Sequence, residues 1–242
     1  MEIFKTRLAD RKQLTADVWE FKFEIGLEQE LNFQTGQGLT LLLEEKQRFY
    51  PLCSPDFSKN SVVFLTKLPP EDEISNYLRI LEIEDRVYFK GPSGDFILKQ
   101  TQIPKLFLAT GIGIGPIRSQ IVSLLQGKKD TQTKLFLFWG VRRDEAAYFF
   151  EEFKTLKQDF PNFDFLICLD KEEDFLGLDV EYFRRGKVNE VFLSYMRESK
   201  VAKSELGSFE YYVCGEKQPI ESIKSFLIEQ GINENNILSQ EV

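Results

Sequence analysis

The chain of 242 residues is 42% hydrophobic and 29% charged, with a formal net charge of −8. Its length and composition suit a folded protein of one large or two modest domains. The negative charge disfavours nucleic-acid binding, which requires a cationic surface. It contains no histidine, which excludes Ser-His-Asp catalysis, histidine-ligated haem and histidine-containing zinc sites. Its three cysteines, Cys53, Cys168 and Cys214, form no CxxC pair, so we expect no iron–sulfur cluster, and any redox chemistry requires an organic cofactor.

Residues 1 to about 100 have the pattern of short β-strands. Val18–Ile25 and Arg86–Lys90 alternate apolar and polar residues, as half-buried strands do. Leu39–Leu43 and Ser61–Thr66 are apolar or β-branched runs bounded by turn residues. Ile74–Leu81 carries the spacing of a helix. The pattern predicts an antiparallel β-barrel or sandwich.

From Lys105 onward, predicted strands and helices alternate. The predicted strands are Lys105–Thr110, Lys134–Trp139, Phe163–Leu169 and Tyr211–Cys214. The predicted helices are Ile117–Gln126, a helix capped by Asp144 that ends near Lys157, Val188–Lys200 and Ile220–Gln230. Repeated β–α units predict a parallel sheet with helices on both faces. The polar stretch Lys99–Pro104 marks the boundary, which gives predicted domains over residues 1–100 and 101–242.

The segment Thr110–Ser119 follows a predicted strand and precedes a predicted helix. Its glycines, Gly111, Gly113 and Gly115, let the backbone turn sharply and approach a pyrophosphate, whose charge the helix N-terminus stabilises. Pro116 suits the first helical turn, where its missing N–H needs no partner. We interpret this loop as a dinucleotide-binding loop, and the alternative is a purely structural turn.

Pro116 stands where the ordinary Rossmann fingerprint has glycine or alanine, and the GxGxxP pattern resembles the nucleotide loop of the ferredoxin–NADP⁺ reductase family. Further segments resemble motifs of that family in the family's order: the F-x-x-G-Q turn at Phe33–Gln37, the RxYS flavin motif at Arg48–Pro55, the FAD-phosphate helix at Ile74–Leu78, the strand end before the second domain at Gly91–Phe96, and later strand ends at Trp139–Arg142 and Val213–Gly215. The resemblance covers nearly the whole chain and implies an FAD-binding β-barrel followed by an α/β domain that binds NADH or NADPH.

The resemblance also implies which residues contact FAD. Arg48 would give the pyrophosphate a bidentate contact, and Tyr50 would stack on the isoalloxazine ring. Ser75, beside Ile74 at the start of the predicted helix, would meet a phosphate. A solvated arginine, a core tyrosine and an N-capping serine are the alternatives. Further flavin-lining positions are implied at Pro51, Leu52, Cys53, Ser54 and Lys67.

On the nucleotide side, the resemblance implies contacts from Thr110 and the glycine loop, and from Cys214 and Gly215 near the nicotinamide ring. Tyr50, Cys214 and Glu241 are the implied catalytic positions. The alternative for Cys214 is a small buried hydrophobic residue, and Glu241 lies among terminal residues, which are frequently frayed.

Asp170 and Arg142 follow predicted strands and bear on the choice of coenzyme. A carboxylate at Asp170 would repel a 2′-phosphate and accept a hydrogen bond from a ribose hydroxyl, which favours NADH. Arg142, Arg143 and Lys171 are near in sequence and would favour NADPH.

Several positions depart from the family pattern. Pro51 replaces the serine or threonine of RxYS, so the side-chain hydroxyl and one backbone N–H are missing. Ile112 replaces a threonine of the nucleotide loop, and Glu216 stands where proline is common. The chain ends at Val242 without the C-terminal aromatic residue of plant-type members. These departures concern hydride transfer more than flavin binding.

We therefore expect an FAD-dependent NAD(P)H reductase that passes electrons to a separate ferredoxin-like or oxygenase-type protein, or to small acceptors. The alternatives are a flavin-binding electron-transfer or assembly subunit without direct NAD(P)H oxidation, and a nucleotide-binding protein without flavin. No apolar run approaches the ~20 residues that cross a bilayer, and the start of the chain at Met1–Arg7 does not resemble a secretory signal. We expect a cytoplasmic protein without a membrane partner.

Overall fold

The structure is a computed structural model that describes residues 1–171, 175–199, 201 and 203–242. Contacts within the chain divide it into two compact units. The first contains Met1–Lys99 and Gly115–Lys128, and the second contains Gln100–Ile114 and Lys129–Val242. The segment 115–128 makes its contacts within the first unit. The domain boundary at residue 100 stays a prediction.

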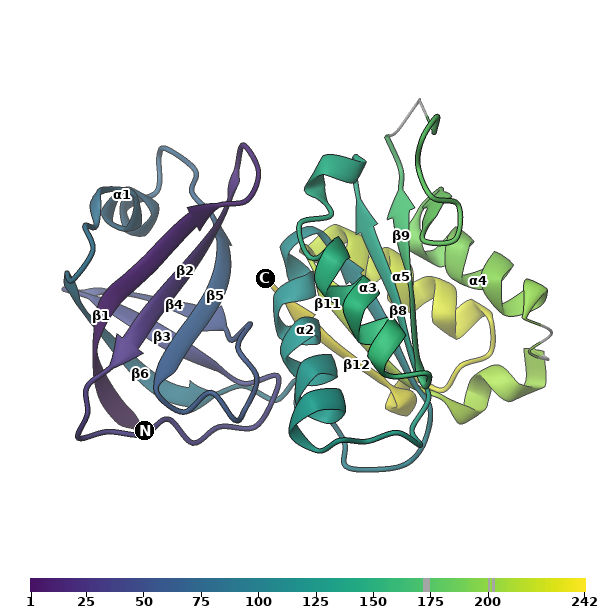
Figure 1. Ribbon diagram of the computed structural model, residues 1–242, viewed down its shortest axis with the longest axis horizontal. Coiled ribbons are helices and arrows are strands. Elements are labelled where there is room, and N and C mark those ends of the chain that lie inside the picture. The colour runs from purple at the N-terminus through teal and green to yellow at the C-terminus, as the bar shows by residue number, and fades with distance from the viewer. Residues whose placement is uncertain (172–174, 200, 202) are drawn as a thin grey trace. The chain divides into compact units, whose positions relative to one another are not determined.

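Six antiparallel strands form the sheet of the first unit, in the order β4-β3-β6-β1-β2-β5. They are β1 (Glu2–Gln13), β2 (Val18–Ile25), β3 (Gly38–Leu43), β4 (Lys46–Pro51), β5 (Ser61–Lys67) and β6 (Arg86–Ser93). The sheet curls so that its edge strands β4 and β5 contact each other (Figure 1). Just beyond β4, the Cys53 N–H donates to the Val63 carbonyl at 2.7 Å. The curled sheet confirms the predicted antiparallel, barrel-like class.

Aromatic side chains fill the interior of this sheet. Phe21, Phe23, Phe64 and Phe89 are fully buried, and the Phe23 and Phe64 ring centroids are 5.7 Å apart. Helix α1 (Glu73–Ile80) adds apolar side chains to the same core. This burial of large apolar surface supplies the main stabilisation of the unit.

The second unit contains a sheet of six strands in the order β10-β9-β8-β7-β11-β12, and every neighbouring pair is parallel. The strands are β7 (Lys105–Thr110), β8 (Leu135–Val141), β9 (Phe163–Leu169), β10 (Phe183–Arg185), β11 (Glu210–Gly215) and β12 (Ile237–Glu241). The sheet confirms the predicted parallel α/β class. The strand order reverses between β7 and β11, and ligands of such sheets bind at the carboxyl ends of the strands at this switch point.

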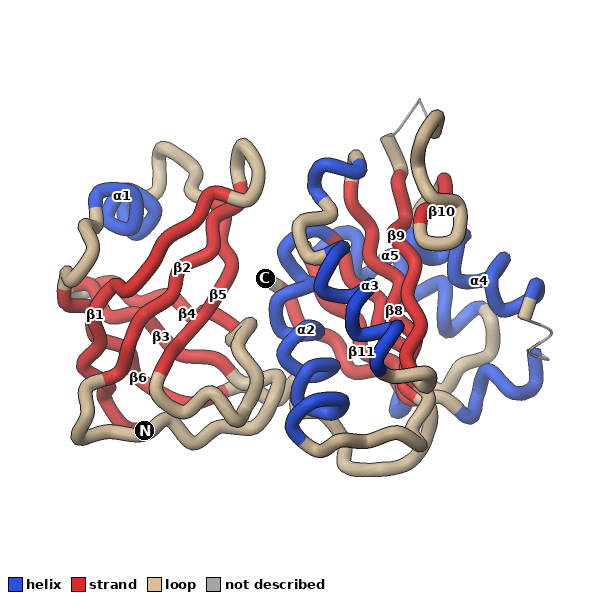
Figure 2. Tube along the Cα trace, viewed as in Figure 1, coloured by secondary structure: helices blue, strands red, loops and turns tan. Residues whose placement is uncertain are grey.

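Helices α4 (Val188–Glu198) and α5 (Lys217–Glu229) cover one face of the parallel sheet, where they enclose an apolar core with side chains of β7, β8, β9 and β11. Helix α3 (Phe150–Asp159) covers the other face, where Phe153 contacts Trp139, Phe163 and Phe165 (Figure 2). Helices on both faces agree with the prediction.

Helices α2 (Ile114–Val122) and α3 do not begin where the sequence pattern predicted. Helix α2 begins three residues earlier than expected and continues as a π-helical turn over Ser123–Gly127. The prediction that Asp144 caps a helix is wrong, because Asp144–Ala146 forms a 3₁₀ turn and α3 begins at Phe150. The predicted end of α4 at Lys200 lies outside the described residues.

A buried ion pair joins the first residues of β7 and β11. The Lys105 ammonium, which is fully buried, donates to Glu210 Oε2 at 2.7 Å and to Thr101 Oγ1 at 3.1 Å. The Thr101 hydroxyl donates to the other Glu210 oxygen at 2.9 Å. A buried charge left without its partner is strongly destabilising, so separating the two central strands at this end would be costly.

We expect Lys105→Met to lower the free energy of unfolding by about 3 kcal/mol, because it leaves the Glu210 carboxylate buried without its cation. Lys105→Met with Glu210→Leu should cost less, since no charge then remains unpaired. Denaturant unfolding followed by circular dichroism measures both values. Equal losses in the single and double variants would contradict this assignment.

Candidate functional site

The glycine loop lies at the switch point of the parallel sheet. It follows β7 as a 3₁₀ turn over Gly111–Gly113, and Gly111 has a φ of 53°, a conformation that glycine adopts readily. At Gly113 a Cβ atom would lie 2.3 Å from the Cys214 carbonyl oxygen at the end of β11. Close backbone approach therefore requires glycine at this position.

The last residues of β7 and β11, Thr110 and Gly215, also approach each other closely. A Cβ on Gly215 would lie 1.9 Å from Thr110 Oγ1. The Trp139 indole N–H at the end of β8 donates to the Gly111 carbonyl at 3.0 Å, which fixes the turn. The Thr110 hydroxyl is buried and has no hydrogen-bond partner within the described part of the chain. These contacts hold the loop in place and leave the buried Thr110 hydroxyl without a hydrogen bond within the described residues.

Cys214 and Glu241 lie on neighbouring strand ends of the same edge. Burial raises the pKa of the Cys214 thiol, so the residue is a protonated thiol at neutral pH and not a nucleophilic thiolate. Glu241 lies on β12, where Gly215 pairs with it in register, and its side chain is exposed. The structure thus brings both predicted positions to the edge that carries the glycine loop.

Arg142 and Asp170 directly follow β8 and β9, and both side chains are exposed. The Lys171 N–H donates to the Arg142 carbonyl at 3.1 Å, and the Asp170 N–H donates to the Val141 carbonyl at 3.4 Å. One carboxylate therefore lies on an exposed edge together with the two cations of Arg142 and Lys171.

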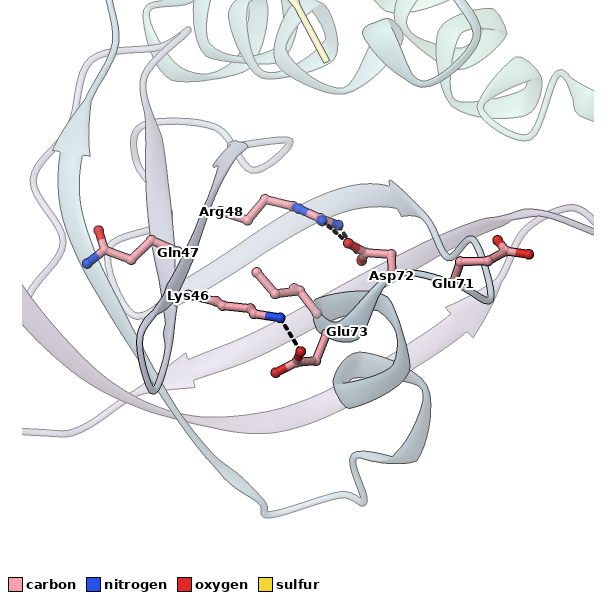
Figure 3. A pocket seen from close by; sticks show the side chains of 7 residues that line it. Lys46, Gln47, Arg48, Glu71, Asp72 and Glu73 are labelled. Atoms are coloured by element: carbon pink, nitrogen blue, oxygen red, sulfur yellow. Dashed lines mark hydrogen bonds and ion pairs between the residues drawn. The ribbon is translucent and has the colours of Figure 1, made fainter.

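An open pocket of about 400 Å³ lies in the first unit and contains Arg48. Figure 3 shows Arg48 directed at Asp72 and Lys46 directed at Glu73. Arg48 makes a bidentate contact with the Asp72 carboxylate, with Nη1 2.8 Å from Oδ2, and Lys46 forms an ion pair with Glu73. Arg48 is therefore not a simply solvated side chain.

Asp72 is the N-cap of α1, a role that sequence reasoning considered for Ser75. Its Oδ2 accepts a hydrogen bond from the Ser75 backbone N–H at 2.6 Å, as expected for an N-capping aspartate. The Arg48 guanidinium holds the pKa of Asp72 well below its usual range. The sequence carried a signal for this residue, because aspartate three positions before Ser75 at a helix start is a common N-cap.

Tyr50 and Ser75 carry buried hydroxyls without partners. The Tyr50 ring is 4% exposed and stacks on Phe64, with centroids 4.2 Å apart. Burial raises the pKa of Tyr50, so its hydroxyl keeps its proton. Neither this hydroxyl nor that of Ser75 makes a hydrogen bond of normal geometry within the described residues, although Arg48 and Thr66 lie near the first and Asp72 near the second. Such groups are costly to bury, and a bound ligand with polar atoms would satisfy them.

The segment that follows Tyr50 is held by hydrogen bonds to its backbone. The Leu52 N–H donates to the Gln37 carbonyl at 3.1 Å. Arg118 donates to the Cys53 carbonyl at 2.9 Å, and the Ser119 hydroxyl donates to the Ser54 carbonyl at 2.7 Å. Sequence reasoning did not anticipate these contacts from α2.

The remaining predicted positions of the first unit belong to strand or helix ends. Pro51 ends β4 and pairs with Gly38. Ile74 is buried in the first turn of α1. Lys67 ends β5, where its ammonium is 3.9 Å from Asp17 Oδ2.

Two family models match the chain. The model of the oxidoreductase FAD-binding domain matches residues 5–97, and that of the oxidoreductase NAD-binding domain matches residues 107–225. The chain belongs to the ferredoxin–NADP⁺ reductase-like flavoproteins. The two matches correspond to the barrel-like sheet and the parallel sheet. Members of this flavoprotein family are oxidoreductases.

The chain is also similar in sequence to a subunit of a larger reductase. This relative is one of the subunits of the Na⁺-translocating NADH-quinone reductase of Klebsiella pneumoniae, and it is 29% identical over 170 residues. These residues are 70% of this chain and 40% of the relative. The chain thus spans less than half the length of this relative.

Two solved structures share the fold. A cytochrome P450 reductase, GcoB of Amycolatopsis, has a TM-score of 0.84 at 18% identity, covering 99% of this chain and 69% of that chain. A ferredoxin NADP⁺ reductase from Neisseria gonorrhoeae with bound FAD and NADP has a TM-score of 0.79 at 16% identity, covering 100% of this chain and 99% of that chain.

Two classes of site or element are absent from the described part of this flavoprotein. No helix among the described residues has the length and apolar character to pass through a bilayer. The same residues hold no group of three or more Asp, Glu, Cys or His side chains placed to bind a metal ion.

We expect Gly113→Ala to destabilise the fold by about 1–3 kcal/mol, because the new methyl group overlaps the Cys214 carbonyl. The displaced loop should also bind NADH and NADPH at least tenfold more weakly. Thermal melting and coenzyme titration measure the two effects. Gly207→Ala is the matched control, since nothing lies within 4 Å of a Cβ there. A Gly113 variant as stable as the Gly207 variant would contradict the close approach.

Proposed function

We propose that the chain is an FAD-dependent NAD(P)H reductase that delivers electrons to a separate carrier protein. Residues 1–100 form its FAD-binding domain and residues 101–242 its NAD(P)-binding domain. The observation that carries the proposal is a set of three buried hydroxyls, on Tyr50, Ser75 and Thr110, that have no hydrogen-bond partner within the described residues. Each belongs to a residue that the family resemblance places against a cofactor.

In the first unit, we assign Tyr50 and Ser75 to FAD together with Arg48. Phe64 stacks on one face of the Tyr50 ring and the residue is buried, so we assign its buried hydroxyl to the flavin. Arg48 and the N-terminus of α1 suit the negative charge of the pyrophosphate. Ile74 positions that helix by packing in the core. Further contacts are assigned to Pro51, Leu52, Ser54 and Lys67.

In the nucleotide loop, we assign Thr110, Gly111, Gly113, Gly115 and Pro116 to the pyrophosphate of NADH or NADPH. The turn leads directly into the N-terminus of α2, and the N-terminus of a helix favours bound phosphate. Bound FAD supplies the chemistry, since a flavin accepts hydride from a nicotinamide and releases electrons singly.

At the neighbouring strand ends, we assign Cys214, Gly215 and Glu241 to the nicotinamide side and Arg142 and Asp170 to the adenosine side. The protonated Cys214 thiol is a small, weak hydrogen-bond donor. Asp170 favours a ribose hydroxyl over a 2′-phosphate, so NADH is the proposed coenzyme.

The proposed acceptor is a ferredoxin-like or oxygenase-type protein. Support comes from the P450 reductase whose fold this chain shares. The proposed compartment is the cytoplasm, because the chain has only three cysteines and all of them are buried, whereas proteins of oxidising compartments are often rich in disulfides.

A second candidate is a flavin-binding electron-transfer or assembly subunit that does not oxidise NAD(P)H itself. It is favoured by Pro51, which brings neither a hydroxyl nor an N–H to the flavin segment. It is also favoured by the relative that is a subunit of a larger reductase.

The purified chain should show flavin absorbance that bleaches on mixing with NADH, and more slowly with NADPH, in a stopped-flow instrument. Arg48→Leu should weaken FAD binding at least tenfold and leave binding of riboflavin, which has no phosphate, unchanged. If neither coenzyme bleaches the flavin, the reductase proposal fails and the flavin-binding subunit is favoured. A colourless chain that FAD does not colour would overturn both.

We expect Pro51→Ser to reduce its flavin faster, because a hydroxyl and a backbone N–H return to the segment beside Tyr50. The control is Pro161→Ser, an exposed position in the turn before β9. The rate of flavin bleaching by NADH under single-turnover conditions measures the effect. An unchanged or slower rate in the Pro51 variant would show that the missing groups do not limit the reaction.

A further inference from the structure

The two groups assigned to the FAD pyrophosphate already bind an anion that belongs to the chain. Asp72 Oδ2 accepts from both Arg48 Nη1 at 2.8 Å and the Ser75 N–H at 2.6 Å. Its other oxygen accepts from Arg48 Nη2, and Figure 3 shows this carboxylate facing the guanidinium. A carboxylate with two oxygens on a guanidinium and a helix N–H occupies the place that two phosphate oxygens would take.

The charges around the site favour the contact of the Asp72 carboxylate with Arg48 and with the N-terminus of α1. Glu71, Asp72 and Glu73 follow one another at the start of α1, where the helix dipole favours negative charge. Glu73 is neutralised by Lys46 and Asp72 by Arg48. A diphosphate that approached with Asp72 in place would contact the carboxylate directly. The Arg48 guanidinium would already be paired and could not neutralise the phosphate charge. The two anions cannot share the site without strong repulsion.

The Ser75 side chain shows that the carboxylate does not complete the site. Ser75 is fully buried, and its hydroxyl has no partner within the described residues. Asp72 accepts a well-formed hydrogen bond from the backbone N–H of this residue, and its carboxylate lies near the hydroxyl without a hydrogen bond of normal geometry between them. An anion with more oxygens than a carboxylate, such as a phosphate, would satisfy the hydroxyl as well. The site is therefore built for a larger anion than the one that holds it.

We propose that Asp72 is a specificity-determining residue of the flavin site, which holds Arg48 and Ser75 in the flavin-free chain and has to leave them before a diphosphate binds. This inference rests on the proposed function. Because only chains with an open site bind FAD, the apparent affinity for FAD falls in proportion to the open fraction. Flavins without a phosphate do not use these groups, so Asp72 leaves their affinity unchanged.

The test is a titration of the full-length flavin-free chain with FAD and with riboflavin, followed by flavin fluorescence. Asp72→Asn keeps the shape and a capping oxygen and removes the charge. We expect this variant to bind FAD about tenfold more tightly than the unchanged chain, with riboflavin affinity unchanged. Asp72→Ser, another capping residue, should behave alike, and circular dichroism verifies that both variants fold.

Glu71→Gln is the matched control for charge. Glu71 lies one residue away, its side chain is exposed, and Figure 3 shows it extending away from Arg48. Its removal changes the net charge equally but frees no group of the site, so FAD affinity should change by at most about twofold. A gain in Glu71→Gln equal to that in Asp72→Asn would overturn the inference in favour of a general charge effect.

The Arg48→Leu variant separates failure of this inference from failure of the proposed function. If Arg48→Leu weakens FAD binding while both Asp72 variants bind FAD no more tightly than the unchanged chain, the inference fails and the phosphate site stands. If Arg48→Leu leaves FAD affinity unchanged, the pyrophosphate does not bind at Arg48. In that case the inference and the phosphate site of the proposed function both fail.

Discussion

The close approach of β7 and β11 is the constraint on which the rest of this flavoprotein depends. These two strands are neighbours in the sheet and far apart in the chain, and the order of strands reverses between them. At one end the buried Lys105–Glu210 pair joins them. At the other end, Gly113 and Gly215 allow contact with the opposite strand that any side chain would prevent. The glycine loop is held in place because both ends of this strand pair are fixed.

The barrel-like sheet meets a different constraint, since it holds the positive charge of Arg48 in a partly buried pocket. An arginine in a pocket without a partner would be costly to keep partly desolvated. Asp72 removes this cost by neutralising Arg48 and capping α1 with the same carboxylate. The flavin-free fold thereby gains stability through the groups that a ligand needs. Under the proposed function, the stability of this region and its affinity for the cofactor are therefore opposed.

Regular alternation made much of the fold predictable. Val18–Ile25, Lys105–Thr110 and Phe163–Leu169 begin and end where their patterns predicted, because burial of one or both faces dictates each residue type. The strands β1 and β12 were missed, since β1 continues into a run of exposed polar residues and β12 buries only Ile237. Asp144 failed as a cap because a 3₁₀ turn intervenes before α3. The contact between Arg48 and Asp72 joins residues 24 positions apart, and local pattern carries no information on such a pair. The motif residues were predictable from resemblance, whereas their partners required the fold.

Burial of the sulfur atoms has a consequence for durability during turnover. All three cysteines are buried, and burial raises the pKa of Cys168 and Cys214. Oxidants attack the exposed thiolate and not the shielded thiol. A reduced flavin that loses electrons to oxygen produces peroxide beside its own protein, and here the sulfur atoms are kept in the form that peroxide oxidises least. The packing that closes the two cores thus also serves as protection against the by-product of the chemistry they support.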